Sequence, residues 1–203
     1  MTPEPTESPG EDKAWAKIQT TLQPAELREF CSDLARLYRI NPYMEFRVWQ
    51  EPAPGRVHAE FRNHSNNQDY ILNLTLVPVS EYAFHISYDH GIKAATHFEI
   101  EAAEGGSALT ITDDYNRLSA EERAQRMSEV DKSLPAWSQA IHDYLRRHDR
   151  WGWMAPWRWY MRHVWIPMKP SARRIAWLLY LITIVEFLFF VFVALIWWIE
   201  HRS

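Results

Sequence analysis

The feature that most constrains this chain is an apolar run of 25 residues, from Ile175 to Ile199. Its only ionisable side chains are those of Tyr180 and Glu186. As a helix the run covers roughly 37 Å, at about 1.5 Å per residue, which exceeds the roughly 30 Å hydrocarbon core of a bilayer. The run therefore predicts a transmembrane helix that spans with some tilt. Because only residues 200–203 follow it as a short tail, we expect a single-pass, tail-anchored protein.

Charged residues are distributed unevenly along the rest of the chain. Segment 146–174 holds eight Lys or Arg and one Asp, whereas residues 1–145 hold 13 Lys or Arg and 23 Asp or Glu. A basic flank marks the cytoplasmic side of a transmembrane helix, so we expect a cytoplasmic N-terminal domain. The single cysteine, Cys31, allows no intramolecular disulfide and agrees with that compartment. An acidic domain repels nucleic acid, which we therefore exclude as a partner.

Segment 151–174 is rich in tryptophan and in basic residues. Indole rings favour the headgroup layer of a membrane, and basic side chains favour anionic lipids. We interpret the segment as an interfacial collar on the lipid bilayer; the alternative is an aromatic patch that packs on the soluble domain or on a partner subunit. The residues assigned to the membrane interface are Trp151, Trp153, Trp157, Trp159, Trp165, Arg173 and Arg174.

Glu186 lies near the middle of the apolar run, one helical turn after Thr183. An ionised carboxylate at the bilayer centre costs about 2.5–3.5 kcal/mol on insertion scales. One interpretation is a protonated Glu186 that a very apolar helix tolerates. The other is that Thr183 and Glu186 form an intramembrane contact with a polar group of another transmembrane helix. The partner would then be a second copy of this chain or another membrane protein.

Residues 1–12 hold three prolines and four acidic residues and predict a disordered tail. The remaining domain, residues 13–150, begins with an alternating run over 14–22 and a helical pattern over 23–40. A helical stripe over 119–148, which we expect Pro135 to kink or split, closes it. Between these helices, six alternating runs separated by short turns predict antiparallel strands. The runs cover residues 43–49, 56–62, 69–79, 82–88, 94–102 and 107–115.

This order of elements resembles the helix-grip fold of the START and Bet v 1-like superfamily, also called SRPBCC or polyketide cyclase-like proteins. The stretches TTLQPAELREFCSDL, RINPYMEF and EGGSALTITDDY carry the resemblance. It implies an α+β fold in which a curved antiparallel sheet of about seven strands surrounds a long C-terminal helix. It also implies an apolar cavity for a hydrophobic small molecule such as a lipid, sterol, isoprenoid, polyketide or quinone, and in some members catalysis.

The cavity face of the sheet follows from register. If the turn at Asp89-His90-Gly91 pairs Tyr88 with Ala94, alternate side chains sort into one apolar face and one polar face. The helical stripe must cover the apolar face, and we expect the ligand between the two. The residues assigned to the ligand cavity are Phe46, Phe61, Tyr70, Leu72, Leu74, Tyr82, Phe84, Ile86, Tyr88, Phe98, Ile100, Ile111, Tyr115, Trp137 and Ile141. Met44 and Val48 fall on the same face.

Two other groups of residues could take part in catalysis or metal binding. Asp113 on the apolar face is a candidate acid or base, because burial raises a carboxyl pKa; the alternative is ordinary polar chemistry near a strand end. His85 and His97 are expected to oppose each other on the polar face as candidate metal ligands, or as exposed strand histidines. No phosphate-binding loop, nucleophile elbow or CxxC motif occurs. We therefore expect neither a metal nor a cofactor.

Three functions remain open from the sequence. The first is a membrane-anchored module that binds a lipid, isoprenoid or quinone at the cytoplasmic membrane surface. The second is an accessory or assembly subunit of a larger membrane complex, docked through its transmembrane helix. The third is a cyclase or dehydratase. The stretches that carry the resemblance contain no catalytic signature, which favours a protein that is not an enzyme.

Overall fold

The computed structural model describes residues 13–202. The tail predicted for residues 1–12 lies outside the described residues, and so does Ser203. The chain divides into two compact units, Met1–Ile166 and Pro167–Ser203. Each unit is described by itself.

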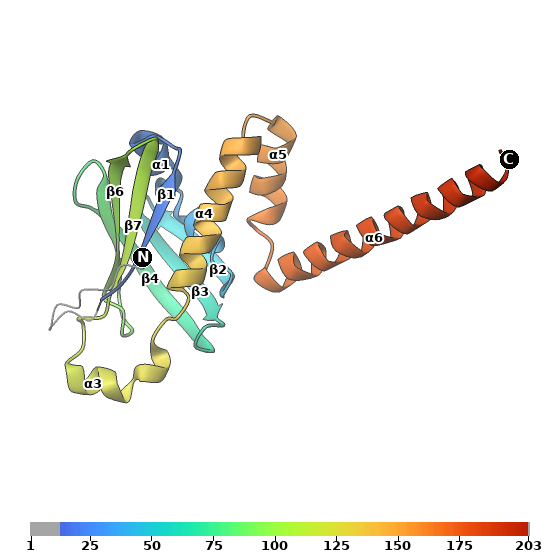
Figure 1. The fold of residues 1–203 in the computed structure, drawn as a ribbon. Helices are drawn as coiled ribbons and strands as arrows, with labels where there is room; N and C mark the ends of the chain where they lie inside the picture. The colour runs from blue at the N-terminus through green and yellow to red at the C-terminus, as the bar shows by residue number, and fades with distance from the viewer. Residues whose placement is uncertain (1–12, 203) are drawn as a thin grey trace, which may run out of the picture. The chain divides into compact units, whose positions relative to one another are not determined.

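The first unit is built on one antiparallel sheet (Figure 1). Its spatial order is β1-β7-β6-β5-β4-β3-β2, so that β1 and β2 form the two edges. All neighbours except β1 and β7 follow each other in sequence, as short turns between antiparallel strands require. The strands are β1 (Lys13–Thr20), β2 (Met44–Ala53), β3 (Arg56–Asn63), β4 (Gln68–Pro78), β5 (Ala83–Tyr88), β6 (Ala95–Ala103) and β7 (Gly106–Asp114).

Helices enclose the apolar side of this sheet. Trp137, Ile141 and Leu145 form a stripe on α4 and are buried in the same core as Phe84 and Phe98 of the strands. The Trp137 indole donates a hydrogen bond to the Leu37 carbonyl at 2.8 Å, which joins α4 to α2. The predicted α+β arrangement of a curved seven-stranded sheet and a long C-terminal helix is confirmed. The helices are α1 (Pro24–Ser32), α2 (Leu34–Arg39), α3 (Ala120–Gln125), η1 (Met127–Glu129), α4 (Leu134–Trp151), α5 (Ala155–Tyr160) and η2 (Met161–Trp165).

Both helical segments expected from the sequence are divided in the structure. The helix expected over 23–40 is two helices, because Asp33 ends α1 and its side chain accepts a hydrogen bond from the Arg36 amide at 3.0 Å to begin α2. The helix expected over 119–148, with a kink or split at Pro135, is divided into α3, η1 and α4. Pro135 lies in the first turn of α4, where its missing N–H costs nothing, and so it marks a helix start rather than a kink.

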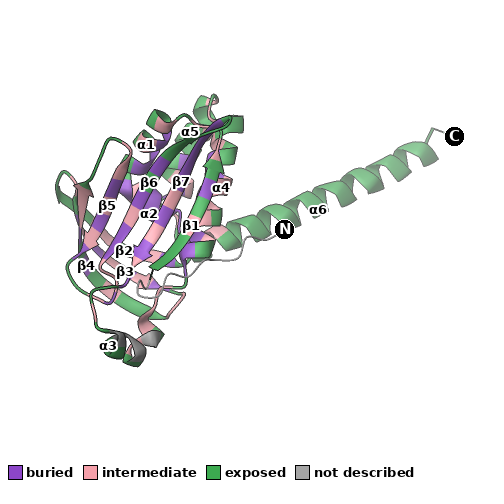
Figure 2. Cartoon of the chain, turned by 60° about the vertical axis from the view of Figure 1, so that its left-hand side comes forward, coloured by how far each residue is buried: buried purple, intermediate pink, exposed green. Residues whose placement is uncertain are grey.

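The predicted strand register is confirmed in the hairpin of β5 and β6. His85 pairs with His97, and Phe84 pairs with Phe98. Burial alternates along these strands as the apolar and polar faces require (Figure 2). The assignment of Val48 to the apolar face is wrong, because β2 contains an irregularity between Phe46 and Val48. One extra residue reverses the alternation.

As a result of this irregularity, Trp49 rather than Val48 packs against the core. Trp49 pairs with buried Ala59. Its indole ring lies 5.1 Å from the Phe46 ring.

The second unit contains α6 (Pro170–Glu200), a helix of 31 residues. Its mean hydropathy over an 18-residue window is 2.7, and none of that window is buried. Exposed residues run along the whole helix (Figure 2). The helix is therefore long and apolar enough to span a membrane.

Candidate functional site

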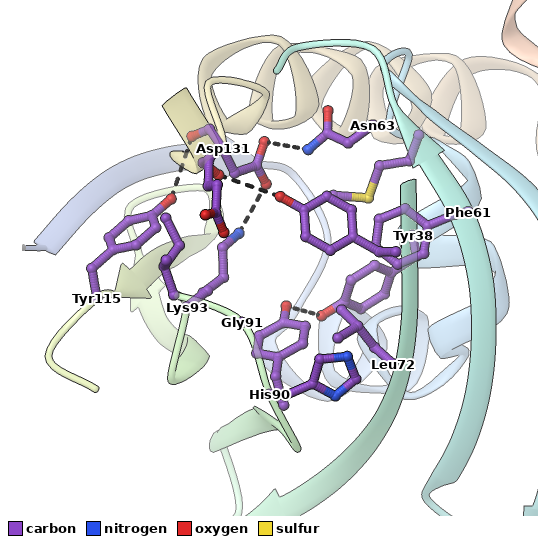
Figure 3. Close-up of a pocket in the computed structure, with 14 residues that line it drawn as sticks. Tyr38, Phe61, Asn63, Leu72, His90, Gly91, Lys93, Tyr115 and Asp131 are labelled. Atoms are coloured by element: carbon purple, nitrogen blue, oxygen red, sulfur yellow. Dashed lines mark hydrogen bonds and ion pairs between the residues drawn. The ribbon is translucent and has the colours of Figure 1, made fainter. Parts of the chain in front are cut away.

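A pocket lies where the sheet meets the β5–β6 loop and the segment between β7 and α4 (Figure 3). It contains about 450 Å³ of space outside the atoms, part of which is open solvent. The lining residues are Tyr38, Met44, Phe61, Asn63, Tyr70, Leu72, Tyr88, His90, Gly91, Ile92, Lys93, Tyr115, Glu129 and Asp131.

Apolar and aromatic side chains form most of the pocket wall. Met44, Leu72 and Ile92 are buried, and the Phe61 ring stacks on the Tyr70 ring at 5.3 Å between centroids. Phe61, Tyr70 and Leu72 come from β3 and β4, where alternate positions point to the same face. Met44 comes from β2 and Ile92 from the β5–β6 loop. A flat apolar group would find both aliphatic and aromatic contacts here.

Lys93 forms the polar end of the pocket. Its Nζ lies 2.8 Å from Asp113 Oδ2 and 2.9 Å from Asp131 Oδ2. The side chains are 13%, 1% and 9% exposed, in the order Lys93, Asp113, Asp131. Because these side chains are buried, each charge is stabilised mainly by its oppositely charged partners rather than by water. The three side chains are called the charge cluster below.

Asp131 connects the charge cluster to the surrounding loops. Its Oδ1 accepts hydrogen bonds from Asn63 Nδ2 at 3.0 Å and from the Ser65 hydroxyl at 3.1 Å. The same oxygen accepts the Ser133 amide at 2.9 Å, just where α4 begins. The Tyr115 hydroxyl donates to the Asp131 carbonyl at 3.3 Å. Asp131 therefore fixes the β3–β4 turn and the start of α4 in one place.

A chain of hydroxyl groups leads from the pocket to Asp113. The Tyr38 and Tyr88 hydroxyls lie 2.7 Å apart, and the Tyr88 hydroxyl lies 2.9 Å from Thr96 Oγ1. Thr96 in turn donates to Asp113 Oδ1 at 2.6 Å. Thr96 and Asp113 are direct cross-strand partners in β6 and β7. The hydroxyl chain thus joins α2, β5, β6 and β7 beneath the pocket.

The ionisation of the cluster follows from burial and charge. Burial acts to lower the pKa of Lys93, but Asp113 and Asp131 outweigh it and hold this pKa well above its usual range. Burial raises the pKa of Asp113 despite the attraction of Lys93. For Asp131, burial is outweighed by Lys93 and by hydrogen bonds from Asn63 and Ser133, so its pKa lies well below the usual range. Burial also raises the pKa of Tyr38 and Tyr88.

The structure divides the residues assigned to the ligand cavity into two groups. Five of them line the pocket, namely Phe61, Tyr70, Leu72, Tyr88 and Tyr115. The others pack within or against the core, namely Phe46, Leu74, Tyr82, Phe84, Ile86, Phe98, Ile100, Ile111, Trp137 and Ile141. The space between the sheet and α4, where a ligand was expected, is occupied by these side chains. Phe84 stacks on Phe98 with centroids 4.8 Å apart.

The structure shows what surrounds Asp113 and the pair His85 and His97, the candidates for catalysis and metal binding. Asp113 does not line the pocket, and its carboxylate accepts hydrogen bonds from Lys93 and Thr96. The His85 and His97 rings lie side by side with centroids 5.2 Å apart, and His97 Nε2 is 3.8 Å from Asp114 Oδ2. Within residues 13–202, no group of three or more His, Cys, Asp or Glu side chains is arranged to hold a metal ion.

The tryptophans assigned to the membrane interface also fall into two groups. Trp151, Trp153 and Trp159 are exposed, whereas Trp157 and Trp165 are half-buried against the core. Both of the latter rings lie 6.3 Å from the Tyr144 ring of α4. Two of the five collar tryptophans thus pack on the domain.

Four more assigned residues lie in α6. Arg173 and Arg174 lie near its start. Further along, Thr183 donates a hydrogen bond to the Leu179 carbonyl of its own helix at 3.0 Å, and Glu186 is exposed.

Sequence reasoning did not identify Tyr38, Lys93 and Asp131 as site residues. Lys93 belongs to the DHGIK turn, where a lysine is ordinarily solvent-exposed. Asp131 falls within the helical stripe predicted over 119–148, whereas the structure places it between η1 and α4. The signal in the sequence is the glycine of this turn: Gly91 lines the pocket and adopts a φ of 93°, a conformation that favours glycine.

Comparison with known proteins identifies the fold alone. No family model and no curated protein matches the sequence. A START superfamily protein from Mycobacterium smegmatis is similar with a TM-score of 0.50 and 11% identity, over 68% of this chain and 99% of the other. Its likeness supports the helix-grip architecture.

Two further solved structures are similar at lower scores. A protein from Rhodobacter sphaeroides has a TM-score of 0.49 and 14% identity, over 69% of this chain and 96% of the other. The di-domain ARO/CYC protein BexL of the BE-7585A biosynthetic pathway has a TM-score of 0.46 and 10% identity, over 66% of this chain and 49% of the other.

Proposed function

We propose that this protein is a membrane-anchored START-like module that binds a hydrophobic small molecule at the cytoplasmic surface of a membrane. The observation that carries the proposal is the pocket, whose walls are apolar and whose polar groups gather at one end around Lys93. An apolar pocket with a few convergent polar groups is the usual form of a small-molecule site. The ligand belongs to the lipid, isoprenoid or quinone class.

Membrane attachment is the second part of the proposal. It is supported by α6 and by the eight Lys or Arg of residues 146–174, which favour a cytoplasmic domain. Exposed Trp153 and Trp159 on either side of Arg158 suit the headgroup layer. A ligand that partitions into the bilayer would then meet the pocket at high local concentration.

Binding is favoured over catalysis by the state of the charge cluster. The raised pKa of Lys93 keeps the amine protonated, which removes it as a nucleophile. Asp113 is separated from the pocket by its contacts with Lys93 and Thr96. The cluster therefore orients a ligand without supplying a free base.

The test is retention of a small molecule by the full chain. The protein is purified in mild detergent and its extract is analysed by mass spectrometry. Leu72→Phe should fill the pocket and lower the amount of co-purified ligand severalfold, because Leu72 is buried in its wall. Ile71→Phe is the matched control, since the adjacent Ile71 is 60% exposed on the other face of β4. Equal ligand in both variants, or no ligand in the unmodified chain, would refute the proposal.

A second function rests on one specific observation. Glu186 is exposed on α6, in the middle of the apolar run. An intramembrane carboxylate in this position suits a polar contact with another transmembrane helix. An accessory subunit of a membrane complex, docked through α6, would use such a contact.

A further inference from the structure

We infer that the polar end of the pocket selects neutral ligands that carry a hydroxyl group and rejects carboxylates and phosphates. The inference rests on the proposed ligand-binding function and narrows its ligand class. Lys93, Asp113 and Asp131 are the residues that determine this specificity. A lone lysine in an apolar pocket would favour fatty acids or phospholipid headgroups, whereas this lysine is already neutralised.

Charge balance is the first argument. Asp131 alone, at 2.9 Å, neutralises the Lys93 ammonium. The cluster therefore carries no net positive charge in either protonation state of Asp113. Glu129, which also lines the pocket, is paired with Arg126 and adds no positive charge. An anionic ligand would enter a poorly solvated site without a counter-charge, which is strongly unfavourable.

The donor capacity of Lys93 is the second argument. A lysine ammonium has three N–H donors, and Asp113 and Asp131 accept two of them. The ammonium lies 5.9 Å from the ring centroids of both Tyr88 and Tyr115. Among residues 13–202, the hydrogen bonds of the Lys93 ammonium are these two, which leaves its third N–H. This N–H can donate to a neutral oxygen of a ligand.

The direction of the hydroxyl chain is the third argument. Thr96 donates to Asp113, so its oxygen must accept from Tyr88, and the Tyr88 oxygen then accepts from Tyr38. Each hydroxyl group in this series donates its proton to the next group toward Asp113. The Tyr38 oxygen at the pocket end keeps its lone pairs as acceptors. Lys93 thus offers the pocket a donor and Tyr38 an acceptor, and a neutral ligand with a hydroxyl group can use either.

The shape of the pocket is the fourth argument. The stacked Phe61 and Tyr70 rings and the buried Leu72 side chain enclose a flat apolar space. The pocket holds about 450 Å³ outside the atoms, part of which is open solvent, so a compact ligand suits it better than a bulky one. The preferred ligand is therefore compact, neutral and hydroxyl-bearing.

Two probes with the same naphthalene ring and different charge test the inference. The full chain in mild detergent is stripped of small molecules and titrated by calorimetry with 2-naphthol, which is neutral, and with 2-naphthoate, which is anionic. The unmodified protein should bind 2-naphthol at least about tenfold more tightly. Asp113→Asn and Asp131→Asn should each reduce this ratio severalfold by removing negative charge. Asp114→Asn, on the same strand but outside the cluster, should leave the ratio unchanged.

Each outcome is decisive. Binding of 2-naphthoate as tight as that of 2-naphthol would overturn the selectivity but leave ligand binding standing. A co-purified neutral molecule with a hydroxyl group supports the inference, and a co-purified fatty acid or phospholipid overturns it. If neither probe binds and nothing apolar co-purifies, the proposed function fails as well. None of these results depends on the folding of a variant.

Discussion

The Lys93 ammonium lies 2.9 Å from the Asp131 carboxylate, and this ion pair fastens the β5–β6 loop to the segment that leads into α4. The two residues are 38 positions apart in sequence. Asp113 contacts the same ammonium at 2.8 Å. Removal of the cation would therefore leave two buried carboxylates facing each other without compensation.

Lys93→Met is expected to destabilise the domain by about 3–5 kcal/mol, the usual cost of leaving buried charges unpaired. Urea unfolding of the full chain in detergent measures the difference. Lys17→Met is the matched control, because Lys17 pairs with Glu101 at 3.0 Å but both side chains are well exposed. The control should cost at most about 1 kcal/mol. Similar losses in the two variants would show that the charge cluster contributes no more than a surface pair.

Asp131→Asn should change the pH dependence of stability. Because the pKa of Asp131 is held below its ordinary value of 3.8 in the folded state, this carboxylate stabilises the fold above that pH. The contribution is lost as the pH falls from the ordinary value through the folded pKa. The difference in unfolding free energy between the unmodified chain and Asp131→Asn should thus be constant near neutral pH and shrink in acid. A difference that grows on acidification would contradict the depressed pKa.

Local patterns in the sequence were sufficient to predict the sheet. The turn at Asp89-His90-Gly91 fixed the pairing of His85 with His97, because a short turn leaves one register for its strands. The irregularity in β2 was not predictable, because no glycine or proline marks the step from Phe46 to Val48.

The charge cluster was not predictable for a different reason. Its pairs form between segments that only the tertiary fold brings together, and a lysine in a turn is ordinarily exposed. Tyr70 and Tyr88 were predicted on the correct face by alternation. Alternation cannot say where along that face a pocket remains, because large side chains such as Phe84 and Trp137 fill the rest.

Gly91→Ala should weaken ligand binding through the loop that carries Lys93. The φ of Gly91 is 93°, which an alanine adopts only with strain, although no atom lies within 4 Å of an added Cβ. We expect a loss of about 1 kcal/mol in stability and a severalfold loss of retained ligand. Gly105→Ala is the control, since Gly105 has a φ of 80° in an equally open turn outside the pocket. It should cost similar stability and leave ligand retention intact; equal retention in both variants would contradict a role for the loop.

The exposed and the packed tryptophans of the collar should respond differently to substitution. Trp157 packs on Tyr144 and lies 5.6 Å from the His148 ring, so Trp157→Ala should cost about 1–3 kcal/mol. Trp153 is 76% exposed, and Trp153→Ala should change stability by less than about 0.5 kcal/mol. In lipid vesicles, Trp153→Ala should remove more of the fluorescence quenching by shallow lipid-borne quenchers than Trp157→Ala does. The reverse order of quenching would place Trp157 at the membrane instead.

Glu186→Leu tests whether α6 contacts a partner helix. The substitution removes a group that is costly in hydrocarbon, so insertion of α6 should improve or stay unchanged. A polar contact with another transmembrane helix is worth about 0.6–2 kcal/mol, enough to reduce co-purification of a partner severalfold in mild detergent. Glu186→Gln keeps a hydrogen-bonding group and should retain most of the partner. Val185→Leu changes the adjacent apolar position and controls for packing. Since Thr183 already donates to the Leu179 carbonyl, its hydroxyl proton is not available to satisfy Glu186. Companions recovered with Glu186→Leu in the same amounts as with the unmodified chain would exclude this carboxylate as the contact.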